Sequence, residues 1–149
     1  MRTIRIQRED FDIAAEIAAL RRACPEAGAI VTFTGIVRAD DGVTAMTLEH
    51  YPDMTEREIS RHVDEAGTRW PIMGTVIIHR IGTLMAGDNV VLVVTASAHR
   101  EPAFVAAEFL MDYLKTRAPF WKEERRGDRA DWAEARESDE SAAKRWDER

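Results

Sequence analysis

The chain is poor in the residues that disulfides and metal centres require. It has one cysteine, Cys24, so it can form neither an internal disulfide nor a cysteine-based metal cluster. Cys24 precedes a proline at an expected helix end, which favours a packing role over that of a nucleophile. The four histidines, His50, His62, His79 and His99, lack the spacing of a metal-binding motif. We therefore expect no metal site and no cofactor, and any sulfur that the protein uses must arrive on another molecule.

Other signatures of common protein classes are also missing. No glycine spacing matches a phosphate-binding P-loop or a dinucleotide fingerprint, and no Gly-x-Ser-x-Gly elbow occurs. No apolar run is long enough to cross a membrane, and the first ten residues lack the apolar core of a signal peptide. These absences predict a cytoplasmic protein.

The composition is that of a single globular domain spanning residues 1–149. Hydrophobic residues make up 45% of the chain and charged residues 32%. The net charge of −6, from 27 acidic and 21 basic residues, argues against a general nucleic-acid binder. A local basic cluster that holds a small phosphorylated ligand remains compatible with this charge.

Periodicity predicts an α+β fold with a mixed or antiparallel sheet and packed helices. Strands are expected at residues 3–7, 29–37, 44–51, 75–81 and 90–98, and the last of these, apolar on both faces, should be central. One helix is expected to run to about residue 23 after a cap at Asp10 or Asp12, and another to run through Ala66 after a cap at Thr55. We expect the strand at 44–51 to pair with that at 29–37 across the turn at 40–42, and residues 82–89 to be a turn.

The most informative stretch runs from His99 to Glu124. Pro102 suits the first turn of a helix, and Pro119 ends that helix near residue 117 or 118. The expected apolar face consists of Phe104, Ala107, Phe109, Leu110 or Met111, Tyr113 and Leu114. Lys115 lies on the opposite, polar stripe with Glu108 and Asp112, which are ordinary ion-pair partners for it.

Two interpretations of the basic residues in this stretch stay open on pattern alone. Lys115 and Lys122 could be solvated surface charges, which is the usual state of lysine. Alternatively, they could form an anion site with Arg100 and Arg117, if the fold brings these four charges together. The aromatic rings beside Lys122 would also partly desolvate it, which lowers the pKa of a lysine and makes it useful as an acid or base. The pattern by itself supports an α+β domain with a possible anion pocket. Such a domain could also be a non-catalytic phosphate- or nucleotide-binding module, or a structural subunit.

Residues 125–149 form a highly charged segment that is nearly free of aliphatic side chains. Such a composition is typical of a mobile tail. Trp132 and Trp146 are unusual in a disordered segment, so we expect part of it to dock on the body of the domain. Residues 142–144 fit a short helix.

Six collinear blocks resemble the large, catalytic subunit of molybdopterin synthase, the MoaE family. They are GAIVTFTGIVR, LEHYPDMTE, HRIGTL, SAHR, MDYLKTRAPFWKEE, and WAEARESD with AAKRW. The resemblance covers nearly the whole chain and implies a hammerhead-like fold. It also implies a small ubiquitin-like sulfur-carrier subunit of the MoaD type, whose C-terminal Gly-Gly thiocarboxylate delivers sulfur to cyclic pyranopterin monophosphate. The family assembly is a dimer of large subunits with a small subunit at each end, a heterotetramer.

The resemblance also assigns site residues by position. Lys115 matches the essential catalytic lysine of the family, and Lys122 matches a second important lysine. The residues implied in substrate binding are Ile36, Val37, Arg38, His99, Arg100, Lys115, Lys122, Glu123 and Glu124. We expect Arg38, His99 and Arg100 to hold the phosphate and pterin, partly across the dimer interface.

Overall fold

The computed structural model describes residues 1–132 and 137–147, so residues 133–136 of the WAEARESD block lie outside the described part. A 3-10 helix (Asp40–Gly42) accompanies the helices and strands. In chain order these are β1 (Arg2–Gln7), α1 (Ile13–Ala23), β2 (Ala29–Ile36), β3 (Ala45–His50), α2 (Met54–Arg69), β4 (Ile72–Arg80), β5 (Gly82–Met85), β6 (Asn89–Ser97), α3 (Arg100–Thr116), β7 (Phe120–Arg126), β8 (Arg129–Trp132) and α4 (Glu137–Lys144). The α+β class is confirmed.

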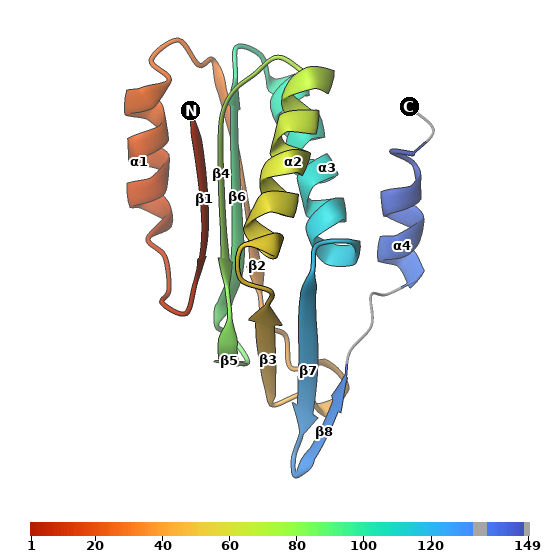
Figure 1. Ribbon diagram of the computed structural model, residues 1–149. Helices are drawn as coiled ribbons and strands as arrows, with labels where there is room; N and C mark the ends of the chain where they lie inside the picture. The colour runs from red at the N-terminus through yellow and green to blue at the C-terminus, as the bar shows by residue number, and fades with distance from the viewer. Residues whose placement is uncertain (133–136, 148–149) are drawn as a thin grey trace.

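The first sheet has the strand order β1-β4-β6-β2 and is covered on both faces. Helix α1 packs on one face, while α2 and α3 pack on the other (Figure 1). Alternating side chains of β6 explain this sandwich: Leu92 and Val94 point toward α1, whereas Val91 and Val93 point toward α2 and α3. The central position expected for this strand is confirmed.

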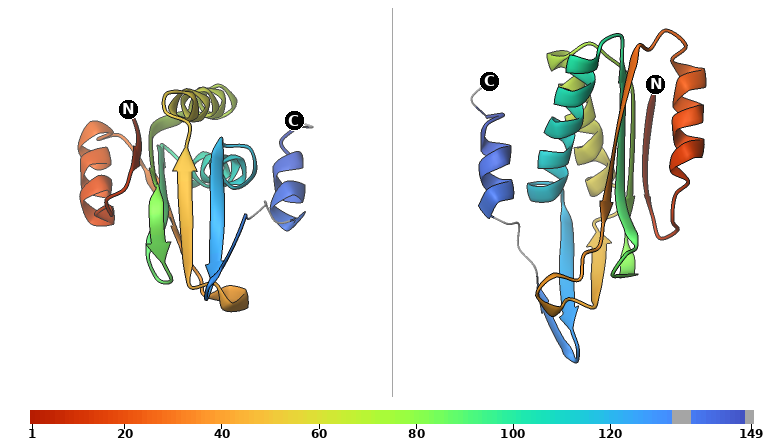
Figure 2. Two further views of the ribbon diagram at one scale, coloured as in Figure 1. Left: turned by 60° about the horizontal axis from the view of Figure 1, so that its bottom comes forward. Right: turned by 180° about the vertical axis from the view of Figure 1, so that it is seen from behind.

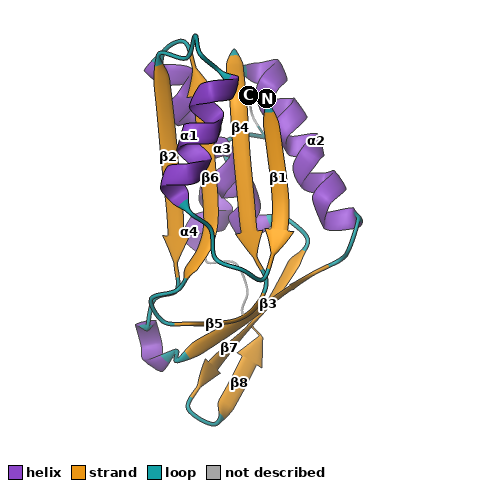
Figure 3. Ribbon diagram, turned by 90° about the vertical axis from the view of Figure 1, so that its left-hand side faces the viewer, coloured by secondary structure: helices purple, strands orange, loops and turns teal. Residues whose placement is uncertain are grey.

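The second sheet, with the order β5-β3-β7-β8, extends from one end of the first (Figure 3). Its small core consists of Val37, Met46, Leu48 and Leu84. Helix α3 leads directly into β7 of this sheet. The second sheet therefore lies beyond the C-terminal end of α3, the end that carries Lys115 (Figure 2).

Two sequence predictions about the strands are wrong. Strand β3 pairs with β5 and β7, whereas β2 pairs with β6 in the other sheet. The register shift after Gly35 and the 3-10 helix separate β2 from β3, so the chain changes sheet instead of forming a hairpin. The segment at 82–89 is also more than a turn, because its first four residues form β5.

The helices differ from the prediction in detail. Asp12 caps α1 by accepting a hydrogen bond from the Ala15 N–H. Helix α2 begins at Met54, and the Thr55 hydroxyl instead accepts from the Tyr51 N–H and donates to the Pro119 carbonyl. In α3 the expected core residue Phe104 is 61% exposed, and small alanines fill the space against β6 in its place.

Candidate active site

The two lysines lie on consecutive elements that meet at the end of α3. Lys115 is in the last turn of α3, and Lys122 is on β7, a strand where a loop was considered from sequence. In β7 the side chains of Phe120 and Lys122 share the inner face of the second sheet, opposite His50 and Leu48 of β3. The Lys122 ammonium lies 3.8 Å from the Glu124 carboxylate.

His79 is near enough to both lysines for their charges to act on it. Its ring is buried and stacks on Phe120 with 4.0 Å between centroids. Its Nδ1 lies 2.8 Å from the Arg80 carbonyl oxygen, which can only accept, so Nδ1 carries the proton and Nε2 keeps a lone pair. Burial, and then the charges of Lys115, His50 and Lys122, lower the pKa of His79 to about 4. A neutral imidazole therefore lies next to two ammonium groups.

The sequence patterns did not single out His79 as a site residue, because the four histidines lack metal-ligand spacing. One sequence signal could have found it, because His79 is two residues after Ile77, a core residue of the same strand. Period-two spacing thus predicts a histidine on the buried face. The stack on Phe120 depends on tertiary structure and has no local signal.

We predict that His79 makes the protein sensitive to acid. Its pKa is about 4 when folded, against 6.5 for an exposed histidine, so stability is lost as the pH falls from 6.5 toward 4. A His79→Phe variant keeps an aromatic ring on Phe120 but cannot be protonated. The drop in unfolding free energy between pH 7 and pH 4, measured by urea denaturation, should be smaller in this variant by about 3 kcal/mol. An equal drop in both proteins would contradict this assignment.

His50 is a further polar group at this site. Its Nε2 lies 3.3 Å from the Glu56 carboxylate, and its buried Nδ1 has no hydrogen-bond partner within the described residues. Buried polar atoms are normally satisfied, so this nitrogen is an exception, and it belongs to the β3 residue that pairs with Phe120 of β7.

The segment after β2 contributes groups of different kinds. Arg38 is exposed and pairs with Asp40 at 2.6 Å. Ile36 is 54% exposed, whereas Val37 is buried in the core of the second sheet. The Val37 backbone is bonded on both sides to the turn at 87–88. Buried Val37 therefore holds the backbone in place, while its neighbours Ile36 and Arg38 have the exposed side chains.

The two glutamates after Lys122 point to opposite faces of β7. Glu124 shares the face of Lys122 and also pairs with Arg126 at 2.9 Å. Glu123 is on the other face, since successive side chains of a strand alternate. The structure therefore brings Glu124, and not Glu123, to the lysine pair.

His99 and Arg100 lie at the opposite end of α3 from Lys115. His99 is the N-cap residue, and both side chains are exposed. Fifteen residues of α-helix separate Arg100 from Lys115, a distance of about 22 Å. Within one chain the structure does not bring these two residues to the lysines. A site that contains all of them requires two copies of the chain.

Chemically, the lysine site is suited to binding anions and moving protons. Lys115 and Lys122 supply charge, and two of the three lysines of the chain gather here. Within residues 1–132 and 137–147, no group of three His, Cys, Asp or Glu side chains could hold a metal ion. None of the described helices is long and apolar enough to span a membrane.

Comparisons with known proteins converge on one family. The family model described as "MoaE protein" matches residues 6–117. The chain is 57% identical over 147 residues to the molybdopterin synthase catalytic subunit of Mesorhizobium japonicum, covering 97% of this chain and 92% of the relative. The structure of a molybdopterin biosynthesis MoaE protein from Burkholderia ambifaria is 51% identical, has a TM-score of 0.85 and covers 99% of both chains.

A more distant solved structure contains two different subunits. It is a complex of subunits 1 and 2 of the molybdopterin-converting factor from Helicobacter pylori, 21% identical with a TM-score of 0.75. The match covers 89% of this chain and 91% of that one. At this identity the likeness confirms the fold alone.

Proposed function

This chain belongs to the MoaE family and is a molybdopterin synthase catalytic subunit, and from that premise we propose how it works. We propose that it transfers sulfur from the C-terminal thiocarboxylate of a small ubiquitin-like subunit to cyclic pyranopterin monophosphate. The observation that carries this proposal is the pair Lys115 and Lys122 beside the buried, neutral His79. This site can bind an anionic sulfur donor and an anionic phosphate together.

The proposed chemistry uses the partner as the source of the nucleophile. The thiocarboxylate sulfur forms a bond to a carbon of the precursor while a carbon–oxygen bond at that carbon breaks, and the oxygen leaves after it takes up a proton. The product of this step is a thioester between the tail and the precursor. Attack of water on the thioester leaves the sulfur on the precursor and a carboxylate on the tail. Two such transfers generate the dithiolene. This route requires no cysteine of the large subunit, in keeping with the buried Cys24 at the end of α1.

We assign the lysines different tasks. Lys115 acts as acid or base at the sulfur-accepting carbons, or serves as the counter-ion of the attacking thiocarboxylate. Lys122 supports the phosphate or the acyl intermediate. It lies on the face of β7 that also carries Glu124 and Phe120, and its charge, like that of Lys115, lowers the pKa of His79.

The substrate pocket is completed by a second copy of the chain. Arg38 from one copy, with His99 and Arg100 from the other, holds the cyclic phosphate and the pterin. The separation of Arg100 from Lys115 along α3 supports this arrangement, because one chain cannot supply both to one small ligand. The working unit is accordingly a homodimer of large subunits with two small subunits, a heterotetramer. The Gly-Gly tail of each small subunit enters a lysine site.

The function is tested by mixing the purified chain with the precursor and a small subunit that ends in a thiocarboxylate. Product carrying the dithiolene, detected by mass, is the expected result. A small subunit that ends in a carboxylate, or that lacks its last two glycines, is the matched control and should give none. Absence of product from a folded chain that binds the small subunit would instead favour a phosphate-binding or regulatory role.

A further inference from the structure

The polar stripe of α3 contains an acid that is well placed to pair with the proposed catalytic lysine. Asp112 precedes Lys115 by three residues, a spacing at which side chains on a helix meet. An acid on the N-terminal side of a lysine is also the favoured orientation for such a pair. An isolated α3 would therefore direct the Asp112 carboxylate toward Lys115.

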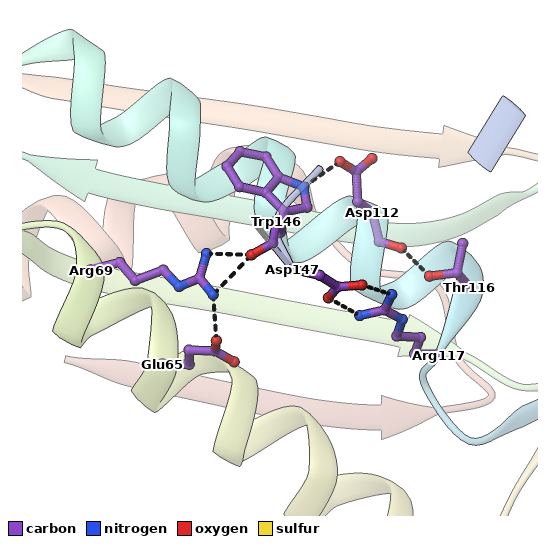
Figure 4. Close-up of polar contacts among 7 residues, drawn as sticks. All are labelled: Glu65, Arg69, Asp112, Thr116, Arg117, Trp146 and Asp147. Carbon is purple, nitrogen blue, oxygen red and sulfur yellow. Dashed lines mark hydrogen bonds and ion pairs between the residues drawn. The ribbon is translucent and has the colours of Figure 1, made fainter. Parts of the chain in front are cut away.

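In the folded chain, residues after α4 bind this carboxylate. The Trp146 indole N–H donates to Asp112 Oδ2 at 2.6 Å (Figure 4). An Arg145 guanidinium nitrogen donates to the same oxygen at 2.7 Å. Arg145 also binds Glu108, one turn earlier on α3, at 2.6 Å. The Asp112 side chain is only 16% exposed, so these charge-assisted bonds form in a largely desolvated place.

The segment that provides these donors is firmly anchored. Trp146 is 4% exposed, and its ring packs edge-on against Trp70 and Phe109. Its carbonyl accepts hydrogen bonds at 3.2 Å from two nitrogens of Arg69. Asp147 then forms a two-bond ion pair with Arg117, at 2.8 and 2.9 Å, just beyond the last turn of α3 (Figure 4). The indole N–H is thus fixed against Asp112 by contacts on three sides.

We propose that Trp146 and Arg145 are positioning residues that hold the Asp112 carboxylate against α4 and so keep it from pairing with Lys115. Asp112 then takes no part in neutralising the Lys115 ammonium when the sulfur donor and the precursor bind. This inference rests on the proposed function of Lys115 and adds a task for the C-terminal segment. The segment controls the environment of the catalytic lysine as well as covering α3.

Other charged groups also face this end of α3, and a pH experiment must hold them constant. They are Glu108 and Arg117 on α3, Lys144 and Asp147 at α4, Glu65 and Arg69 on α2, His50 on β3, His79 on β4, and Lys122 and Glu124 on β7. None of these is altered by the substitutions at Trp146, Arg145 and Asp112 described below.

The test follows the titration of Lys115 directly. Lysine labelled with 13C at Cε gives one signal for each of the three lysines, which Lys→Arg variants assign. Trp146→Phe keeps an aromatic ring in place but removes the N–H donor, and Arg145→Gln removes the charged donor. Release of Asp112 toward Lys115 stabilises the ammonium, so the pKa of Lys115 should rise in both variants. The turnover number should fall about tenfold at constant KM for the small subunit.

An Asp112→Asn background provides the matched control. There the same two substitutions should leave the Lys115 titration where Asp112→Asn alone puts it. A shift of equal size in that background, or no shift in either background, overturns the proposal. If Trp146→Phe does not fold, Arg145→Gln, at a 40% exposed side chain, decides the outcome. The titration needs no sulfur transfer, so failure of the wild type to make product would defeat the proposed function without deciding this inference.

Discussion

Replacement of Lys115 by alanine should lower the rate of dithiolene formation by about a thousandfold, the range expected for loss of a group that moves protons or balances developing charge. The Lys115 side chain is exposed in the last turn of α3 and is not part of the buried face of the helix, so its removal leaves that face intact. Single-turnover mass measurement of product is the readout, with thermal unfolding as the check on folding.

Two further substitutions make this result specific. Lys144→Ala removes an exposed lysine of α4 and should leave the rate unchanged. Lys115→Arg keeps the charge but cannot release a proton at working pH, so it separates the two roles proposed for Lys115. A role as acid or base predicts that the arginine variant is as slow as the alanine variant. A role as counter-ion predicts that it retains much of the rate. Wild-type rate in Lys115→Ala would remove Lys115 from the mechanism.

Two inactive variants should restore activity when they are combined. In the proposed arrangement each site draws Lys115 from one copy and Arg100 from the other, so Arg100→Ala and Lys115→Ala should each damage every site of their own dimers. In a mixed dimer, one site receives both intact residues. Equal amounts of the two chains, unfolded together and refolded, should therefore recover about a quarter of the wild-type activity.

A second mixture serves as the control for this complementation. Lys115 and Lys122 come from the same chain in every site, so Lys115→Ala mixed with Lys122→Ala should remain at the level of the separate variants. Recovery in this control, or no recovery with Arg100→Ala, would show that the shared-site arrangement is wrong. Sedimentation analysis of each mixture confirms that mixed dimers form.

The sequence predicts well those features that depend on short-range patterns. Residues 90–98 are apolar on both faces, and they do form the central strand β6. The spacing of Pro102 and Pro119 bounds α3 to within about two residues, because both prolines restrict the backbone locally. The six blocks also identified the family, which the 57% identity to a curated relative confirms.

Features that depend on contacts between distant segments were missed. The pattern of residues 45–50 predicts a strand but does not show which strands pair with it. One of its partners, β7, follows two helices later in the chain. The stack of His79 on Phe120 and the capture of Asp112 by Trp146 likewise join residues far apart in the chain. The separation of Arg100 from Lys115, in contrast, follows from the sequence, because Pro102 and Pro119 place the two residues at opposite ends of one helix.

The central claim is that sulfur passes from the partner tail to the precursor at the lysine site. The most direct measurement is a single turnover with a small subunit whose thiocarboxylate carries 34S, with the mass of the product as readout. We expect a dithiolene in which both sulfurs are 34S, formed by the wild type and not by Lys115→Ala. Product with unlabelled sulfur, or labelled product formed equally fast by Lys115→Ala, would contradict it.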